Sequence, residues 1–200
     1  MTKNIVMDMG NVLLDFDPQV PLDRYCSTPE EKELVRRELF QAPEWLMADQ
    51  GLIRDCERFD HIKDRVPRQH WPALKACADN WWVCMHNPIP GALDFLHDCK
   101  AAGFGLYILS NASDLFFTYF PAFCPLEFFD GAVVSCQEKL LKPDPEIYRR
   151  LLERYHLAPE TCYFVDDRQD NVAAAQSLGM GGHVFRMDYP AIRRELGMKL

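Results

Sequence analysis

Short apolar runs alternate with stretches of helical periodicity in two parts of the chain. Buried strands are predicted for residues 4–9, 105–110, 132–134, 162–165 and 183–185, where apolar residues follow one another. Helices are predicted for residues 92–102, 145–155 and 171–178, where apolar positions recur at helical spacing. Strands that alternate with helices in this way indicate a parallel α/β sheet with helices on both faces.

Residues 18–87 break the alternation. They contain no run with strand character, but the stretches 30–40, 54–66 and 70–82 are amphipathic in the manner of helices. We therefore expect an α/β core domain of residues 1–17 and 88–200, with residues 18–87 forming a helical domain inserted after the first strand. Four tryptophans of the insertion are expected to form the core of its helical bundle, and these are Trp45, Trp71, Trp81 and Trp82.

The formal net charge of −8 restricts the partners that the chain is expected to have. Nucleic-acid binding needs clustered Lys and Arg residues, whereas a small phosphorylated metabolite needs only a few local cations. No basic segment followed by an apolar one marks a secretory signal, and no apolar run approaches the roughly 20 residues of a membrane span. The eight cysteines, none in a C-x-x-C pair, are expected to be reduced thiols in the cytoplasm.

Several polar residues follow the predicted strands, and in an open parallel sheet ligands bind beyond the carboxyl ends of the strands. The residues expected at that edge are Asp8, Ser110, Asn111, Lys142, Asp166 and Asp167. Taken singly, most of them have an ordinary explanation as a turn residue, a helix N-cap or a surface lysine. Two adjacent carboxylates after a buried strand are harder to explain without a cation, because they repel each other.

These residue types together suit phosphoryl transfer. A carboxylate can act as a nucleophile and form an aspartyl phosphate. Other carboxylates can hold Mg²⁺, a hard cation that prefers oxygen ligands and also bridges to substrate phosphate. A lysine, a hydroxyl and backbone N–H groups can then stabilise the charge on the oxygens of the transferring phosphoryl group.

The same segments resemble, in order and over nearly the whole chain, the four motifs of the haloacid dehalogenase superfamily. The matching sequences are VMDMGNV at residues 6–12, ILSN at 108–111, KPDP at 142–145, and FVDD at 164–167 with Asn171. The resemblance implies a Rossmann-like α/β core. It also implies that the insertion at residues 18–87 is a C1 cap, a helical domain that closes over the site and reads the substrate.

Carried over residue by residue, the resemblance implies a magnesium-dependent phosphatase that forms an aspartyl phosphate. Asp8 would be the nucleophile and a metal ligand, and the other ligands would be the backbone carbonyl of Gly10 and the carboxylate of Asp167. Asp166 would act through a metal-bound water. Lys142 would share in catalysis with Asp8. The phosphate would be bound by three residues, namely Ser110, Asn111 and Lys142.

Within the superfamily, the Gly-Asn-Val ending of motif one and the Asp-Asp pair most resemble the bacterial α-D-glucose-1-phosphate phosphatase type. Residues 49–53 resemble the cap loop that lies over the active site in that group. The implied substrate is a sugar phosphate, with the 1-phosphate favoured, and the oligomeric state stays open. Arg24, Arg54 and Arg168 are further candidates for contact with the substrate.

One position departs from the pattern of most phosphatases in the superfamily. Gly10 stands where a second aspartate normally protonates the leaving alcohol, and such help is worth about 10²–10⁴ in rate. Either the substrate has a good leaving group, as in a sugar 1-phosphate or an acyl phosphate, or Asp15, Asp17 or Asp49 supplies the proton. Two other functions stay open: a metal-independent 2-haloacid dehalogenase, which gains nothing from two adjacent acids, and a catalytically silent binding protein.

Overall fold

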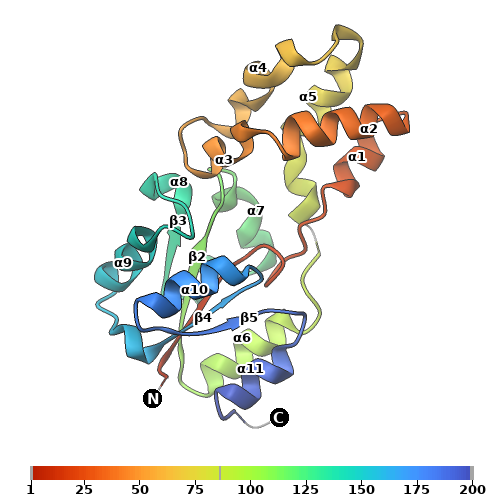
Figure 1. Cartoon of the computed structure of the whole chain (residues 1–200). Coiled ribbons are helices and arrows are strands. Elements are labelled where there is room, and N and C mark those ends of the chain that lie inside the picture. The colour runs from red at the N-terminus through yellow and green to blue at the C-terminus, as the bar shows by residue number, and fades with distance from the viewer. Residues whose placement is uncertain (1, 86, 199–200) are drawn as a thin grey trace.

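A five-stranded parallel sheet lies at the centre of the computed structural model, which describes residues 2–85 and 87–198 (Figure 1). The strand order is β3-β2-β1-β4-β5. The strands are β1 Asn4–Met7, β2 Gly105–Ser110, β3 Gly131–Val134, β4 Cys162–Asp166 and β5 Gly181–Val184. The predicted α/β fold is confirmed, and the order of the strands reverses between β1 and β4, which is where ligands bind in open sheets of this kind.

Alternate residues of each strand face two different layers of helices. Ile5 and Met7 pack with residues of α6, α7 and α11 on one face, and Val6 and Phe164 pack with α9 and α10 on the other. The bounds of these helices are α6 Ala92–Ala101, α7 Phe116–Phe123, α9 Pro145–Arg154, α10 Gln169–Ser177 and α11 Tyr189–Glu195. Both faces of the sheet are therefore apolar and covered, as parallel sheets require.

The helices predicted for the core are confirmed with small shifts at their ends, but α7 has no counterpart among them. Its sequence FFTYFPAF is apolar on almost all sides and contains Pro121, so it lacks the period of an amphipathic helix. Strand β5 begins at Gly181, earlier than predicted, because two glycines pair with β4 although they carry no apolar signal. Three short elements complete the core: α8 Ser135–Glu138, η6 Leu126–Phe128 and η7 Pro159–Thr161.

The insertion forms a second layer of helices at one end of the sheet (Figure 1). Its α-helices are α1 Gln19–Tyr25, α2 Pro29–Val35, α3 Pro43–Asp49, α4 Arg58–Ile62 and α5 Trp71–Asp79. Short π- or 3₁₀-helical turns lie among them: η1 Arg36–Phe40, η2 Asp55–Glu57, η3 Lys63–Arg65, η4 Arg68–His70 and η5 Trp81–Met85. The helix predicted over 54–66 is thus broken into three pieces.

The insertion has a buried core of its own, which includes Leu22, Val35, Leu39, Ile62 and Leu74. A separate core is what an independent domain needs. The exact bounds, 18–87 within 1–17 and 88–200, stay a prediction. Within the described parts of the chain, no helix has both the length and the apolar character needed to cross a bilayer.

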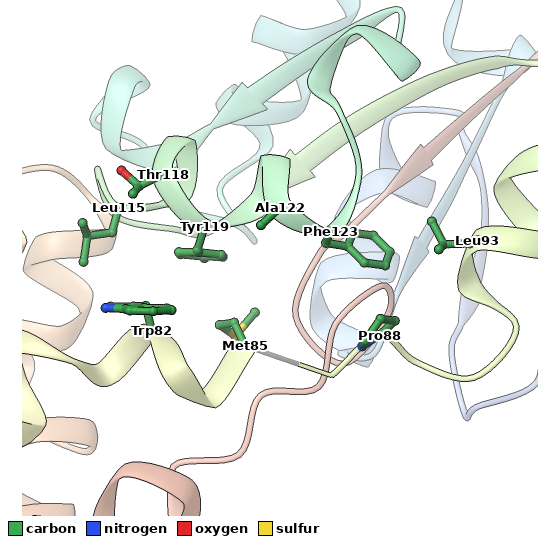
Figure 2. Close-up of a pocket in the computed structure, with 9 residues that line it drawn as sticks. All are labelled: Trp82, Met85, Pro88, Leu93, Leu115, Thr118, Tyr119, Ala122 and Phe123. Atoms are coloured by element: carbon green, nitrogen blue, oxygen red, sulfur yellow. The ribbon is translucent and has the colours of Figure 1, made fainter.

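Of the four tryptophans, only Trp71 packs against the core of the insertion, so the prediction for the other three is wrong. Trp81 is buried in the core cluster of the α/β domain, and Trp45 packs against it with the ring centroids 5.0 Å apart. Trp82 is 42 % exposed and lies opposite Tyr119 of α7, across a cavity that both line (Figure 2). The three rings belong to segments that run along the boundary with the core, and therefore they face the core.

Candidate active site

The polar residues that follow the central strands meet at one edge of the sheet. Asp8 follows β1 directly, while Ser110 and Asp166 are the last residues of β2 and β4. Met7 is in register with Ile108 of β2 and with Val165 of β4, so the residues that follow lie side by side. The strand register therefore brings together groups that are far apart in the sequence.

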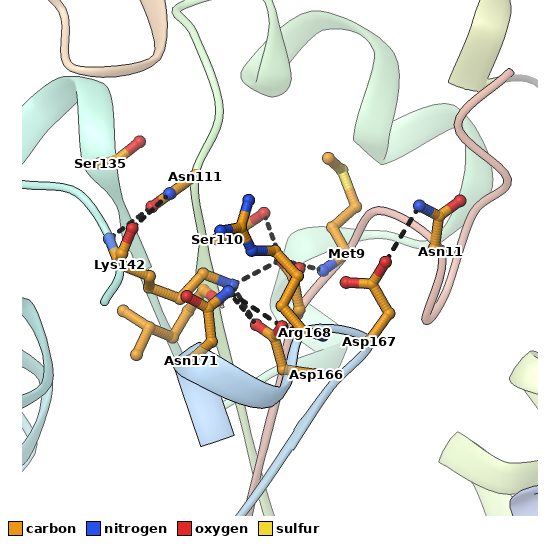
Figure 3. Close-up of polar contacts among 12 residues, drawn as sticks. Met9, Asn11, Ser110, Asn111, Ser135, Lys142, Asp166, Asp167, Arg168 and Asn171 are labelled. Atoms are coloured by element: carbon orange, nitrogen blue, oxygen red, sulfur yellow. Dashed lines mark hydrogen bonds and ion pairs between the residues drawn. The ribbon is translucent and has the colours of Figure 1, made fainter. Parts of the chain in front are cut away.

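Lys142 lies at the centre of this group (Figure 3). It belongs to the loop between α8 and α9, and its Nζ atom lies 2.9 Å from Asp8 Oδ1 and 2.7 Å from Asp166 Oδ2. Nζ also donates a hydrogen bond to the carbonyl oxygen of Leu109, at 2.9 Å. Burial alone would lower the pKa of Lys142, but the two carboxylates outweigh burial and raise that pKa above its ordinary value. The ammonium group is therefore charged.

The two oxygens of Asp8 have different surroundings. Oδ1 accepts hydrogen bonds from the backbone N–H of Met9 and from the hydroxyl of Ser110, each at 2.7 Å, in addition to its contact with Lys142. Oδ2 accepts no hydrogen bond from the residues that the structure describes. Burial raises the pKa of Asp8 to about 6, although Lys142 opposes that rise. One oxygen is thus held in place by three donors, and the other is left for a ligand.

Asp166 and Asp167 are adjacent but differ in their contacts. Asp166 is fully buried, and both of its oxygens accept from the amide of Asn171, at 2.9 and 3.1 Å, besides the contacts with Lys142 and the N–H of Arg168. Asp167 is less buried and accepts one side-chain hydrogen bond, from Asn11 at 3.1 Å. Burial raises the pKa of Asp167. Asp166 therefore orients Lys142, whereas Asp167 keeps most of its lone pairs for another partner.

Three carboxylates of this group fit a divalent cation. One oxygen from each of Asp8, Asp166 and Asp167 lies within 4.8 Å of the others. Gly10, whose carbonyl is expected to be a further ligand, lines the same cavity. The nearest cation, Lys142, supplies one positive charge to three acidic groups. Because oxygen donors and an excess of negative charge are what Mg²⁺ requires, the residues present fit a magnesium ion.

Asn111 lies beside the group, but its side chain is already engaged. Its amide nitrogen donates to the carbonyl oxygen of Lys142 at 3.0 Å, and its amide oxygen accepts from the N–H of Lys142 at 2.8 Å. These two hydrogen bonds fix the loop that carries the lysine. The side chain of Asn111 therefore positions Lys142, and the contact of Asn111 with phosphate stays a prediction.

A cavity of about 410 Å³ opens over these residues and extends to the insertion. On the core side its lining is polar and includes Asp8, Asn11, Ser110, Lys142 and Asp167. The rest of the lining comes mostly from the insertion, is chiefly aromatic or apolar, and includes Phe16, Phe40, Trp45, Leu46, Trp81, Met85 and Tyr119. The sequence patterns did not predict this aromatic wall, since its members come from separate short segments.

Asp49, at the end of α3, is the acidic residue of the insertion that lines this cavity. Burial raises the pKa of Asp49 to about 7, against the attraction of Arg58. The hydroxyl of Ser135 donates to the carbonyl oxygen of Asp49 at 2.5 Å and accepts from the N–H of Ala112 at 2.9 Å. The core therefore holds Asp49 at the site, whereas Gly51 and Ile53 line a different cavity, and the placement of residues 49–53 over the site stays a prediction.

A buried aspartate, Asp55, joins the insertion to the loop after β2. Its carboxylate accepts from the indole N–H of Trp81 at 2.9 Å, from Arg58 Nε at 2.5 Å, and from the hydroxyl of Ser113. The N–H of Leu115 also donates to it, at 3.4 Å. Sequence reasoning did not single out Asp55 or Arg58, because nothing in the local pattern distinguishes them from surface residues.

The three arginines considered as substrate contacts lie in different places. Arg168 lines the cavity, although its guanidinium also pairs with Asp170. Arg54 lies outside the cavity and pairs with Glu57, and Arg24 lies over the ring of its neighbour Tyr25. Of these three, Arg168 is the one placed to reach a ligand.

The chain is similar in sequence to known phosphatases. The chain is 26% identical over 182 residues to a sesquiterpene phosphatase of Aspergillus oryzae, covering 90% of this chain and 88% of that protein. It is 24% identical over 187 residues to a D-ribitol-5-phosphate phosphatase of Bacteroides thetaiotaomicron, covering 90% and 89% of the two chains.

Among solved structures, a haloacid dehalogenase family enzyme of Bacteroides thetaiotaomicron in complex with magnesium and inorganic phosphate has a TM-score of 0.69. It is 22% identical, and the match covers 94% of this chain and 96% of that one. At that identity the likeness shows a shared fold. The family model of the haloacid dehalogenase-like hydrolases matches residues 2–179, nearly the whole chain. This protein therefore belongs to the haloacid dehalogenase-like hydrolase family.

Proposed function

We propose that this hydrolase is a magnesium-dependent phosphatase that cleaves a phosphomonoester through an aspartyl phosphate on Asp8. The observation that carries the proposal is the state of the Asp8 carboxylate. Three donors hold Oδ1, whereas Oδ2 has no hydrogen-bond donor within the described chain, and the residue lines a cavity beside two further carboxylates. A fixed carboxylate with one available oxygen is what nucleophilic attack on phosphorus requires.

In the proposed reaction, Asp8 Oδ2 attacks the phosphorus atom and the bond between phosphorus and the alcohol oxygen breaks. Water then attacks the phosphorus of the aspartyl phosphate, which releases inorganic phosphate and restores the carboxylate. Ser110 and the Met9 N–H keep Asp8 oriented through both steps, and Lys142 offsets negative charge on the phosphoryl oxygens. Bound magnesium would neutralise further charge, with Asp8, Gly10 and Asp167 as its ligands.

Asp49 is the proposed source of the proton for the leaving alcohol. Most phosphatases of the family use a second aspartate for this role, and Gly10 stands at that position. Among the three aspartates considered, Asp49 lines the cavity, whereas Asp15 and Asp17 do not. Asp17 instead accepts a hydrogen bond from the N–H of Gln19, at 2.9 Å. In the first step the carboxylic acid of Asp49 protonates the alcohol oxygen, and in the second its carboxylate takes a proton from the attacking water.

The dehalogenase alternative is weaker because halide leaves without protonation and without a metal. It gives no role to a second and third carboxylate at the nucleophile, nor to an acid at Asp49. A silent binding protein would need none of the hydrogen bonds that fix one oxygen of Asp8. Assays of phosphate and halide release distinguish all three functions.

The identity of the alcohol is a finer question. The resemblance to glucose-1-phosphate phosphatases favours a sugar 1-phosphate. The relatives named above are a sesquiterpene phosphatase and a D-ribitol-5-phosphate phosphatase, whose names imply substrates of very different polarity. A sugar needs several hydrogen-bonding partners, and the insertion side of the cavity offers chiefly aromatic and apolar side chains with Asp49. A sugar 1-phosphate is therefore kept as the alternative to a more apolar substrate.

The first experiment is phosphate release with magnesium and with EDTA, using p-nitrophenyl phosphate, acetyl phosphate, glucose 1-phosphate and glucose 6-phosphate. We expect metal-dependent release by the native chain and a loss of at least about 10³-fold in Asp8→Asn. Asp17→Asn, which removes an exposed carboxylate from the same segment, is the matched control and should keep native rates.

Equal rates for the native chain and Asp8→Asn would overturn the proposal. Release of halide from 2-chloropropionate, with no phosphate from any ester, would assign the dehalogenase reaction instead. Magnesium-independent phosphate release that still requires Asp8 would keep the nucleophile and remove the metal.

A further inference from the structure

A second cavity, of about 510 Å³, lies between the insertion and the core (Figure 2). Trp82 and Met85 of η5 form one side, and the residues of α7, including Tyr119 and Ala122, form the other. Its full lining is Trp82, Met85, Pro88, Leu93, Leu115, Thr118, Tyr119, Ala122 and Phe123. None of these side chains carries a charge, and the volume is within the roughly 300–1,000 Å³ of small-molecule sites. We call it the apolar cavity.

The apolar cavity adjoins the active-site cavity, because two residues, Met85 and Tyr119, line both. The hydroxyl of Tyr119 lies 3.5 Å from the sulfur of Met9, the residue after the nucleophile. A Cβ atom built on Gly10 would lie 3.9 Å from Met85 Cε. The boundary between the cavities therefore lies next to the nucleophile loop, on the side where most phosphatases of the family carry their second aspartate.

Apolar side chains at these two cavities are more exposed than their type usually is. Trp82 is 42 % exposed and Leu93 39 % exposed in the apolar cavity, and Leu46, in the active-site lining, is 55 % exposed. Large apolar side chains that gather at a concave site and stay exposed in the free protein indicate a ligand with apolar surface. A ligand with many hydroxyl groups, such as a sugar, would find few hydrogen-bonding partners there, because in this lining only the side chains of Thr118 and Tyr119 carry hydroxyls.

We propose that the apolar cavity binds the hydrocarbon part of the substrate, so that the preferred substrates are monophosphates of long-chain apolar alcohols. The inference rests on the proposed phosphatase function and names its substrate class. With the phosphate at Asp8 and Lys142, the chain passes the aromatic wall and Met85 and enters the cavity beside α7. Because the apolar cavity shares Met85 and Tyr119 with the catalytic site, we assign it to this occupant rather than to a separate ligand.

Chain length is the quantity that tests the inference. Each methylene that enters an apolar site gains about 0.8 kcal/mol, which corresponds to about a fourfold gain in kcat/KM. Along ethyl, butyl, hexyl, octyl and decyl phosphate, whose leaving groups have nearly equal basicity, we expect kcat/KM to rise by about two- to fourfold per methylene once the chain reaches the cavity. The kcat/KM for decyl phosphate should then exceed the kcat/KM for glucose 1-phosphate by at least about 100-fold.

Two variants fill or charge the apolar cavity. Ala122 is exposed on α7 and faces the cavity, so Ala122→Trp fills the space without disturbing buried packing. Leu93→Glu places a carboxylate where the chain would lie. Both should lower the ratio of the decyl to the ethyl kcat/KM by at least about tenfold. Ala101→Trp, at an exposed helical position outside both cavities, is the matched control and should keep the native ratio.

The outcomes separate this inference from the proposed function. A kcat/KM that depends on metal and on Asp8 could still be constant along the alkyl series, or be highest for glucose 1-phosphate. Either result would support the phosphatase function and overturn the proposal of an apolar substrate. A native ratio in both cavity variants would do the same. If Ala122→Trp changed the oligomeric state in gel filtration and not the ratio, the cavity would be an interface between copies of the chain. Absence of any Asp8-dependent phosphate release would instead remove the function on which the inference rests.

Discussion

The carboxylate of Asp49 lies 3.8 Å from Arg58 Nη2, and both side chains are buried. The distance is too long for a hydrogen bond, and neither Nη atom of Arg58 has a hydrogen-bond partner among the described residues. The guanidinium instead lies 4.1 Å from the centroid of the Trp45 ring. Arg58 therefore attracts Asp49 without fully offsetting its burial, and Asp49 can hold a proton near neutral pH beside the nucleophile.

The first prediction concerns the dependence of Asp49→Asn on the leaving group. An alkyl phosphate needs protonation of its leaving oxygen, whereas p-nitrophenolate leaves without it. Because kcat/KM reports the first step alone, we expect kcat/KM for butyl phosphate to fall about 10²–10⁴-fold in Asp49→Asn, and kcat/KM for p-nitrophenyl phosphate to change by less than about tenfold.

Asp15→Asn and Asp17→Asn are the controls for this comparison, because they remove carboxylates that do not line the cavity. Either of them reproducing the selective loss would move the acid to that residue. An equal loss on both esters in Asp49→Asn would show that Asp49 supports the structure of the site and does not supply the proton.

The second prediction concerns stability and pH. Folded Asp49 keeps its proton up to a pKa of about 7, whereas the unfolded carboxyl loses its proton near 3.8. Between these values the folded state binds the extra proton, so the contribution of Asp49 to the free energy of unfolding falls as pH rises, and it stays constant above the folded pKa. The amide introduced by Asp49→Asn does not titrate. From pH about 4 to about 8, the stability of Asp49→Asn relative to native should therefore rise, by up to about 4 kcal/mol.

Urea denaturation in EDTA at both pH values measures this difference. Leu46→Asn, an exposed position on the same helix, is a control that should follow the native pH profile. Parallel profiles for Asp49→Asn and the native chain would contradict the raised pKa of Asp49.

The third prediction contrasts two lysines. Lys142→Met leaves the buried carboxylates of Asp8 and Asp166 facing each other without a cation, so we expect a loss of about 3–5 kcal/mol in the free energy of unfolding, together with a loss of phosphatase activity. Lys75→Met breaks a surface pair with Asp79 and should cost less than about 1 kcal/mol. Denaturant titration at neutral pH checks both values, and similar losses for the two variants would refute the central role of Lys142.

The fourth prediction uses binding alone. Magnesium without substrate should raise the melting temperature of the native chain, since it binds the folded carboxylate cluster. Asp167→Asn should weaken the apparent affinity by about tenfold or more. Asp170→Asn, which removes a nearby exposed carboxylate paired with Arg168, should leave the affinity unchanged. Calorimetric titration measures the three affinities, and equal values for native and Asp167→Asn would place the metal elsewhere.

The fold was predictable because the strands of the core carry their own signal. The apolar runs are buried on both faces, and the polar residues that follow them have no place in such a sheet except at its edge. That is why Asp8, Ser110 and Asp166 could be assigned to one location before any contact was known. Helix α7 escaped prediction for the opposite reason, because its apolar residues lie on nearly all sides and leave no amphipathic period.

The contacts made by the insertion were beyond reach of the sequence patterns. Asp49, Asp55 and Arg58 are buried by tertiary packing between short segments, and their neighbours in sequence do not differ from those of surface residues. The hydrogen bonds of the Asn111 side chain could not be predicted from the sequence for the same reason. Its motif predicts a location at the phosphate, whereas its hydrogen bonds to the backbone of Lys142 depend on the path of a distant loop.

The central position of β1 has a consequence for synthesis of the protein. Asn4 is in register with Gly105 of β2 and with Cys162 of β4, so both neighbours of β1 are translated long after it. At roughly 5–20 residues per second, β1 waits several seconds for its first partner and longer for its second. A nascent chain that ends before β4 exposes the edge of β1 that β4 would pair, and it lacks the carboxylates that complete the site. Interrupted translation therefore yields fragments that are inactive and prone to aggregate, the kind of product that chaperones and proteases must clear.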